Sequence, residues 1–189
     1  MSVEADQELA SEVFQRVTGD FAMVVGKEFS DIDTQSERAD SRPAGGGCIH
    51  VSFKFGFQMN GVSSQGCFVV PLPVAITLAG HLMLQSDETV AELRAKTTLD
   101  LDTKDAILEL SNFAANAVEA AFKNVGQNDV EVRSAGCQGV RADVRPAFEY
   151  EEGSELLVGR GKTKLEDIEQ PFEMLLMVPA ALVPVPEPA

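Results

Sequence analysis

The chain has 189 residues, and its 30 Asp and Glu against 15 Lys and Arg give a formal net charge of −15. A chain this negative repels phosphate backbones, so nucleic-acid binding is not expected. The length fits one domain, and no apolar run reaches the roughly 18–20 residues of a membrane-spanning helix, so we expect no membrane insertion. The start, MSVEADQELASE, lacks the basic and apolar segments of a signal peptide, and we expect a cytoplasmic location.

The first half of the chain predicts a helix, a loop and a hairpin. We expect a helix over 6–17, a short strand over 21–25, and a mobile surface loop over 30–47, which contains three consecutive glycines. Residues 49–59 alternate apolar and polar side chains, which is typical of a strand with one buried face. Asn60-Gly61 then predicts a tight turn, with a return strand over 66–72.

Further helices and strands follow. Pro73 suits the first turn of a helix that continues over 74–84, and 86–95 is either a second short helix or an extended connection. The last eleven residues contain four prolines and predict an extended tail. Strands are predicted over 129–134, 148–150, 155–164 and 172–178. The sequence therefore predicts one α+β domain over 1–178, with a largely antiparallel sheet flanked by helices, and a Pro-rich tail over 179–189.

Three cysteines and two histidines offer little material for a metal site. Cys48, Cys67 and Cys137 form no C-x-x-C pair, and we expect them to be buried thiols. His50 belongs to the polar face of its strand, where we expect it to be solvated. His81 is expected to be a helix-end residue and not a ligand. No metal site is predicted.

The most informative segment is a predicted helix over 104–124, with Thr103 as its N-cap. Its polar residues recur at steps of three and four and therefore share one face, called the polar stripe below: Asp105, Glu109, Asn112, Asn116, Glu119 and Lys123. Asn costs roughly half a kcal/mol relative to Ala inside a helix, so two Asn in mid-helix favour a role in contacting a partner. Periodicity alone leaves the alternative open that the stripe is simply solvated.

The pattern Asp105-x-x-x-Glu109-x-x-Asn112 in DAILELSNFAANAVEAAF resembles the signature helix of the CheC/CheX/FliY chemotaxis phosphatases. The preceding GCFVVPLPVAITLAGHLM is similar to that family's strand, proline and alanine-rich helix. The resemblance spans roughly 51–140. Because one Glu-x-x-Asn site is present, the chain looks more like the single-site CheX type than the duplicated CheC type.

The resemblance implies hydrolysis of the aspartyl phosphate on a CheY-type receiver domain. Asn112 would orient the attacking water, and Glu109 would pair with a receiver lysine. Asp105 and Asn116 would contact the same partner. The resemblance implies no cofactor in this chain, Mg²⁺ on the receiver, and a CheX-like homodimer.

Two positions depart from the family pattern. The family has a proline at about the place of Ser134-Ala135-Gly136, and a small residue where this chain has Asn116. These departures leave a second hypothesis open, a non-catalytic module that binds receivers or resembles a flagellar switch protein.

Overall fold

The protein, described by a computed structural model over residues 2–96, 99–149 and 154–183, is built on one antiparallel sheet. The six strands lie in the order β1-β5-β6-β3-β2-β4, and each neighbouring pair is antiparallel. Their bounds are β1 (Asp33–Ala39), β2 (His50–Met59), β3 (Val62–Pro71), β4 (Glu131–Val140), β5 (Leu156–Thr163) and β6 (Phe172–Pro179). The helices are α1 (Ser2–Val25), α2 (Leu72–Leu82), α3 (Asp87–Arg94) and α4 (Leu101–Asn124). The predicted α+β fold class is confirmed.

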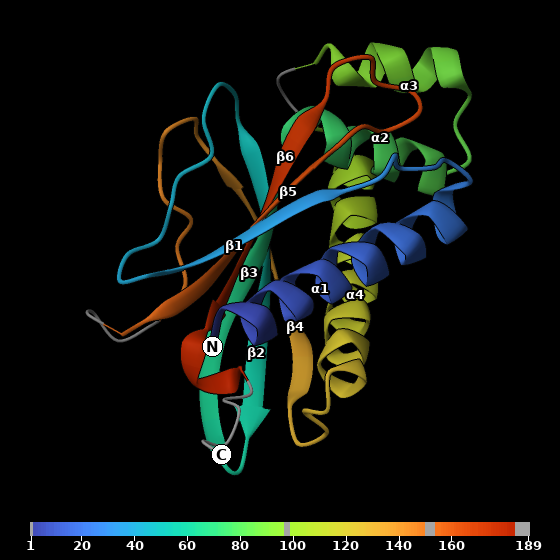
Figure 1. The fold of residues 1–189 in the computed structure, drawn as a ribbon. Coiled ribbons are helices and arrows are strands. Elements are labelled where there is room, and N and C mark those ends of the chain that lie inside the picture. The colour runs from blue at the N-terminus through green and yellow to red at the C-terminus, as the bar shows by residue number, and fades with distance from the viewer. Residues whose placement is uncertain (1, 97–98, 150–153, 184–189) are drawn as a thin grey trace.

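The helices gather on one side of the sheet (Figure 1). Long helices α1 and α4 pack against each other and against the sheet, and their apolar faces enclose the main core with β2 and β3. Phenylalanines dominate this core, among them Phe14, Phe53, Phe57, Phe68 and Phe122. The core therefore holds the buried face of α4 and leaves its opposite face outside.

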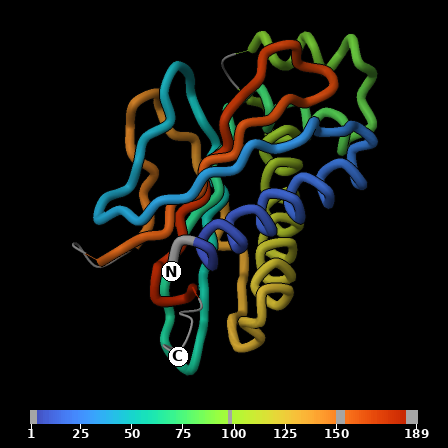
Figure 2. Tube along the Cα trace, in the orientation of Figure 1, coloured from blue at the N-terminus to red at the C-terminus, as the bar shows by residue number. Residues whose placement is uncertain are grey.

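Two irregular segments lie over the other side of the sheet (Figure 2). Residues 41–49 and 141–149 run side by side there: the Asp143 N–H donates to the Gly45 carbonyl at 2.9 Å, and Arg42 donates to the Pro146 carbonyl at 2.5 Å. Phe148, which belongs to the second segment, packs on a smaller apolar cluster from the inner strands β3, β5 and β6. The central strands are therefore covered on both faces.

The predicted hairpin is confirmed in type and position. β2 pairs with β3 from His50↔Pro71 to Met59↔Val62. At its tip Asn60 and Gly61 have φ of 51° and 79°, as a two-residue type I′ turn requires. The return strand begins at Val62, four residues earlier than predicted. α2, β5 and β6 also lie where the pattern predicted them, and 86–95 contains the helix α3. β4 begins within the strand predicted over 129–134 but continues to Val140, six residues farther.

Two predictions near the N-terminus are wrong. Residues 21–25 are not a strand but the last turns of α1, where Phe21 and Val25 continue the buried stripe of the helix. The predicted loop over 30–47 contains β1, an edge strand paired along β5. Its sequence, DTQSERA, is polar up to its last residue, Ala39, so hydrophobic periodicity gives no strand signal.

His50 is buried, at 5% exposure, and the prediction of a solvated side chain is wrong. Its Nδ1 lies 2.7 Å from the Cys48 carbonyl, and its ring packs so closely on Gly45 that a side chain there would clash. The cause is the segment 41–49, which covers the polar face of β2.

The cysteines only partly match the prediction, because Cys67 is buried while Cys48 and Cys137 are half-buried; all three are free. Burial raises the pKa of the Cys67 thiol to about 12.

At the other end of the chain, 148–149 is irregular, and Tyr150 lies outside the described residues. Within the predicted tail, Ala180–Leu182 forms a short 3₁₀ helix, and Leu182 and Val183 pack into the core. The rest of the tail, 184–189, lies outside the described residues.

Candidate functional site

α4 begins three residues before the predicted start. The Asp100 carboxylate caps it by accepting a hydrogen bond from the Thr103 N–H at 2.7 Å. Thr103, the predicted cap, is instead buried within the first turn. The extra residues bring Leu101 onto the exposed surface of the helix, at 72% exposure.

The first four residues of the polar stripe, Asp105, Glu109, Asn112 and Asn116, are all exposed. The positions between them, such as Leu110 and Ala114, are fully buried against the sheet and α1. Glu109 and Asn112 therefore project from one face, away from the protein's own core. Within the described part of the chain, neither side chain makes a hydrogen bond or ion pair, so both are available to another molecule.

The last two residues of the stripe have a different environment. Glu119 is half-buried, and its carboxylate accepts a hydrogen bond from the Val132 N–H of β4 at 3.1 Å. Lys123 lies 3.5 Å from the same carboxylate group. These residues join α4 to the edge strand β4, so the stripe divides into an exposed part and a structural part.

Leu108 is an exposed apolar side chain beside the site that the sequence analysis did not single out. It is 46% exposed and precedes Asn112 by four residues, which places both on the same face of the helix. The spacing of four residues between Leu108 and Asn112 could have identified it, but the polar stripe was defined by polar residues only. The exposed face thus combines two carboxylates, two amides and an apolar side chain.

The segment Ser134-Ala135-Gly136, where the family proline is absent, is a bulge in β4. Ser134 pairs with Phe55 and Cys137 pairs with Phe53, so Ala135 and Gly136 both lie opposite Lys54. Gly136 has a φ of 94°, which L residues with side chains rarely adopt. The bulge lies against α4, since the Ser134 and Ser111 hydroxyls are 2.8 Å apart.

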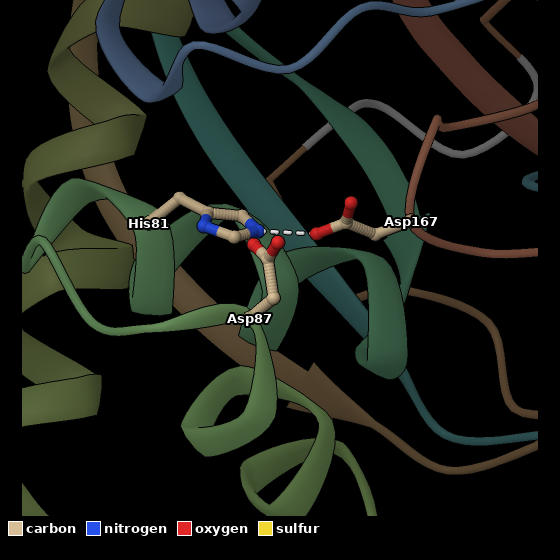
Figure 3. A group of neighbouring side chains, drawn as sticks. All are labelled: His81, Asp87 and Asp167. Carbon is tan, nitrogen blue, oxygen red and sulfur yellow. Dashed lines mark hydrogen bonds and ion pairs between the residues drawn. The ribbon is translucent and has the colours of Figure 1, made fainter.

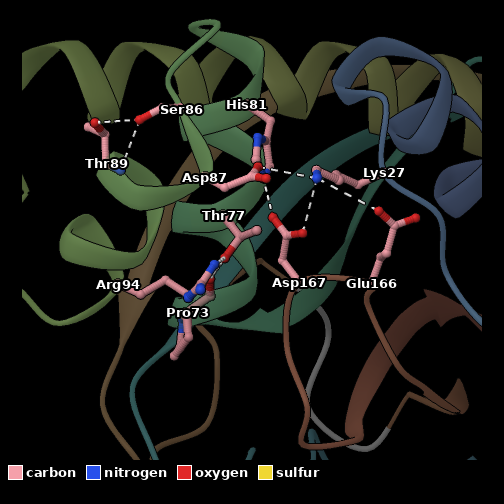
Figure 4. Close-up of polar contacts among 10 residues, drawn as sticks. All are labelled: Lys27, Pro73, Thr77, His81, Ser86, Asp87, Thr89, Arg94, Glu166 and Asp167. Carbon is pink, nitrogen blue, oxygen red and sulfur yellow. Dashed lines mark hydrogen bonds and ion pairs between the residues drawn. The ribbon is translucent and has the colours of Figure 1, made fainter.

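A second group of titratable residues lies outside α4, where α2, α3 and the β5–β6 connection meet (Figure 3). His81 of α2 bonds through Nε2 to Asp167 in the β5–β6 connection, and Asp87 opens α3 beside them. These residue types can bind a metal ion. However, the Lys27 ammonium lies 3.2 Å from both carboxylates and supplies a positive charge there (Figure 4). The group is an ion-pair cluster that ties α1, α2, α3 and the β5–β6 connection together.

The charges of this cluster stabilise one another. Burial raises the pKa of Asp167, but hydrogen bonds from His81 and Lys27 outweigh it, and the net pKa lies below the ordinary value. The hydrogen bonds to Asp167 and Asp87 raise the pKa of Lys27. His81 lies at the end of its helix as predicted, but its bond to Asp167 could not be predicted, because the two residues are 86 positions apart in the chain.

A hollow of about 680 Å³ lies between the tip of the β2–β3 hairpin, the start of β4 and residues 154–156. Its lining includes none of Asp105, Glu109, Asn112 and Asn116. The exposed part of the stripe therefore lies outside this hollow.

No family model matches the chain, and no curated protein matches its sequence. Solved structures do match it. FliY of Thermotoga maritima has a TM-score of 0.67 at 12% identity, over 96% of this chain and 91% of the FliY chain. A CheX protein of Desulfovibrio desulfuricans has a TM-score of 0.57 at 16% identity, over 90% of this chain and 99% of the CheX chain. The FliG–FliM complex of H. pylori contains a chain with a TM-score of 0.63 at 7% identity, and the match covers 94% of this chain and 92% of that one.

The protein therefore has the fold of the CheC, CheX and FliY chemotaxis proteins, as the resemblance predicted. Because the fold is also that of a chain in the FliG–FliM complex, the comparisons do not single out the CheX type. Among the described residues, every helix is too short or too polar to span a lipid bilayer.

Proposed function

We propose that this protein hydrolyses the aspartyl phosphate of a CheY-type receiver domain, with Glu109 and Asn112 of α4 as the catalytic pair. The observation that carries the proposal is the exposure of both side chains on one face of a helix whose opposite face is buried. An exposed, outward-facing pair suits a protein substrate, which brings its own pocket to the enzyme.

The chemistry fits the residue types. Phosphoryl transfer depends on positioning and on stabilising charge, with little covalent help from the protein. The Asn112 amide can orient a water toward phosphorus without adding negative charge next to the phosphate. The Glu109 carboxylate, one turn earlier, pairs with a receiver lysine and so docks the helix. Mg²⁺ bound to the receiver supplies charge neutralisation at the phosphate.

Asp105 and Asn116 extend the same face by about one turn on either side of the pair. We place them in contact with the receiver surface around its phosphorylation site. Asn116 stands where the family has a small residue, so its amide adds a polar contact at the rim. The CheX-like homodimer implied by the resemblance remains a prediction, for which light scattering of the purified protein is the test.

The test is the rate at which a phosphorylated receiver loses phosphate with and without this protein. Asn112→Ala is expected to lower the catalysed rate about 100-fold or more, in the range for removal of one oriented polar group from a transition state. Asn128→Ala is the matched control, because Asn128 is also exposed but lies in the turn after α4. Equal rates for the wild type and Asn112→Ala on a receiver that the wild type dephosphorylates would exclude the catalytic role.

A second candidate function is a non-catalytic module that binds a receiver or a switch protein. It is favoured by the shared fold with a chain of the FliG–FliM complex and by the bulge in place of the family proline. Saturable binding of the receiver by the wild type without faster loss of phosphate would support this candidate over the phosphatase.

A further inference from the structure

A chain of hydrogen bonds connects the bulge of β4 to the turn of α4 that carries Glu109 and Asn112. The Gly136 N–H donates to the Ser134 hydroxyl at 3.2 Å, the Ser134 and Ser111 hydroxyls are 2.8 Å apart, and the Ser111 hydroxyl donates to the Leu108 carbonyl at 2.5 Å. Ser111 is fully buried and Ser134 is half-buried. The contact therefore lies behind the exposed face and not on it.

The direction of each bond follows from the donors available. A serine hydroxyl carries one proton, and a carbonyl can only accept. Ser111 gives its proton to the Leu108 carbonyl, so its oxygen must accept from Ser134. Ser134 in turn accepts from the Gly136 N–H. The bonds all run one way, from β4 to α4, and bonds ordered in this way polarise and strengthen one another.

The carbonyl at the end of this chain belongs to the site. In an α-helix the carbonyl of residue 108 accepts from the N–H of residue 112, so Ser111 shares the acceptor that holds the backbone of Asn112. The same carbonyl is part of the peptide that joins Leu108 to Glu109. The hydrogen bonds thus reach the backbone of both proposed catalytic residues.

The bulge is the feature that supplies the first donor. Gly136 turns its N–H back onto Ser134 in a backbone conformation with a φ of 94°. Proline at 136 would remove that donor, since proline has no N–H. Glu119 fastens the same helix to Val132 farther along β4, so α4 is held at two points against one strand.

We propose that Ser111 and Ser134 are positioning residues, which hold the turn bearing Glu109 and Asn112 in the geometry that phosphate hydrolysis requires. This inference rests on the phosphatase function proposed above. The two serines touch neither the water nor the receiver. They act through the backbone of α4.

The test is steady-state kinetics of receiver dephosphorylation by Ser134→Ala, Ser134→Thr and the control Ser64→Ala. Ser64 is a half-exposed serine of β3 outside this network, and its side chain makes no hydrogen bond among the described residues. Ser134→Ala is expected to lower kcat about fivefold to tenfold, equivalent to one lost hydrogen bond, with KM changed less than about twofold. Ser134→Thr keeps the hydroxyl and is expected to restore kcat, and Ser64→Ala is expected to match the wild type.

A merely structural serine would not give that pattern, because general destabilisation would not be rescued by threonine or confined to kcat. An active wild type with an unchanged kcat in Ser134→Ala would overturn the positioning role alone. A wild type that binds the receiver but does not speed its dephosphorylation would remove the proposed function and this inference with it. Amide exchange at residue 112 provides a second measurement: unaltered protection in Ser134→Ala would show that the bonds do not reach the site.

Discussion

Replacing Asn112 or Asn116 by alanine is expected to stabilise the protein, although Asn112 is proposed to be essential for its activity. Both side chains are exposed in the middle of α4 and make no hydrogen bond among the described residues. Truncation to alanine removes no such bond, and the higher helix propensity of alanine stabilises the folded state by about 0.5 kcal/mol per position. The double variant is therefore expected to gain about 1 kcal/mol, which raises Tm by about 2–4 °C in a chain of this size.

Urea unfolding and thermal melts of the single and double variants measure this gain without any knowledge of the receiver. Asn124→Ala on the same helix is the matched control. The Asn124 amide donates to Glu12 of α1 at 2.6 Å, and losing an exposed bond of about 0.5–1 kcal/mol offsets the gain in propensity. If Asn112→Ala instead lowers the free energy of unfolding by more than about 0.5 kcal/mol, its side chain has a structural partner and is not free for a receiver.

Two further predictions concern the contacts that hold the fold around the site. Arg38→Met is expected to destabilise the protein by about 3 kcal/mol in urea unfolding, because it leaves Asp6, which is 3% exposed, without its bidentate partner at 2.7 and 2.8 Å. A loss below about 1 kcal/mol would mean that β1 is held to α1 by other contacts. Because the pKa of Asp167 is lowered in the folded state, the stability that it contributes is present above its unfolded pKa of about 4 and is lost as the pH falls through the lower folded value. The difference in unfolding free energy between the wild type and Asp167→Asn is therefore expected to be largest near neutral pH and to shrink below about pH 4, and a difference independent of pH would exclude this coupling.

The sequence predicted the elements whose apolar pattern has one clear period. β2 alternates strictly, Asn60-Gly61 fits one turn type, and α4 keeps its polar residues at steps of three and four. The exposed part of the polar stripe follows from that spacing alone. These features are local, so neighbouring residues carry the whole signal.

Features that depend on distant partners could not be predicted in the same way. β1 is polar at every position except its last alanine, and it is a strand because β5 offers backbone partners and because Gln7 and Arg38 tie it to α1. His50 was expected in solvent because alternation identifies a polar face but not what lies over it. The Lys27 cluster joins residues from four parts of the chain, and no spacing connects them.

The candidate site likewise has one part that is local in the sequence and one part that depends on distant residues. The exposure of Glu109 and Asn112 can be predicted from the sequence, because an exposed polar stripe on a helix has a period. The contact between Ser111 and Ser134 could not be predicted in this way, since the two residues are 23 positions apart and no spacing connects them.

The exposed side chains of α4 need a rigid backbone beneath them. A side chain that must enter another protein cannot be held by bonds of its own, because those bonds would compete with the partner. Its orientation must then come from the backbone beneath it. In α4 that backbone is held by alanines packed closely on the sheet, by Glu119 on Val132 and by Ser111 on Ser134. The exposed pair is free at its tips and fixed at its base, as the proposed positioning of a water molecule on a separate protein requires.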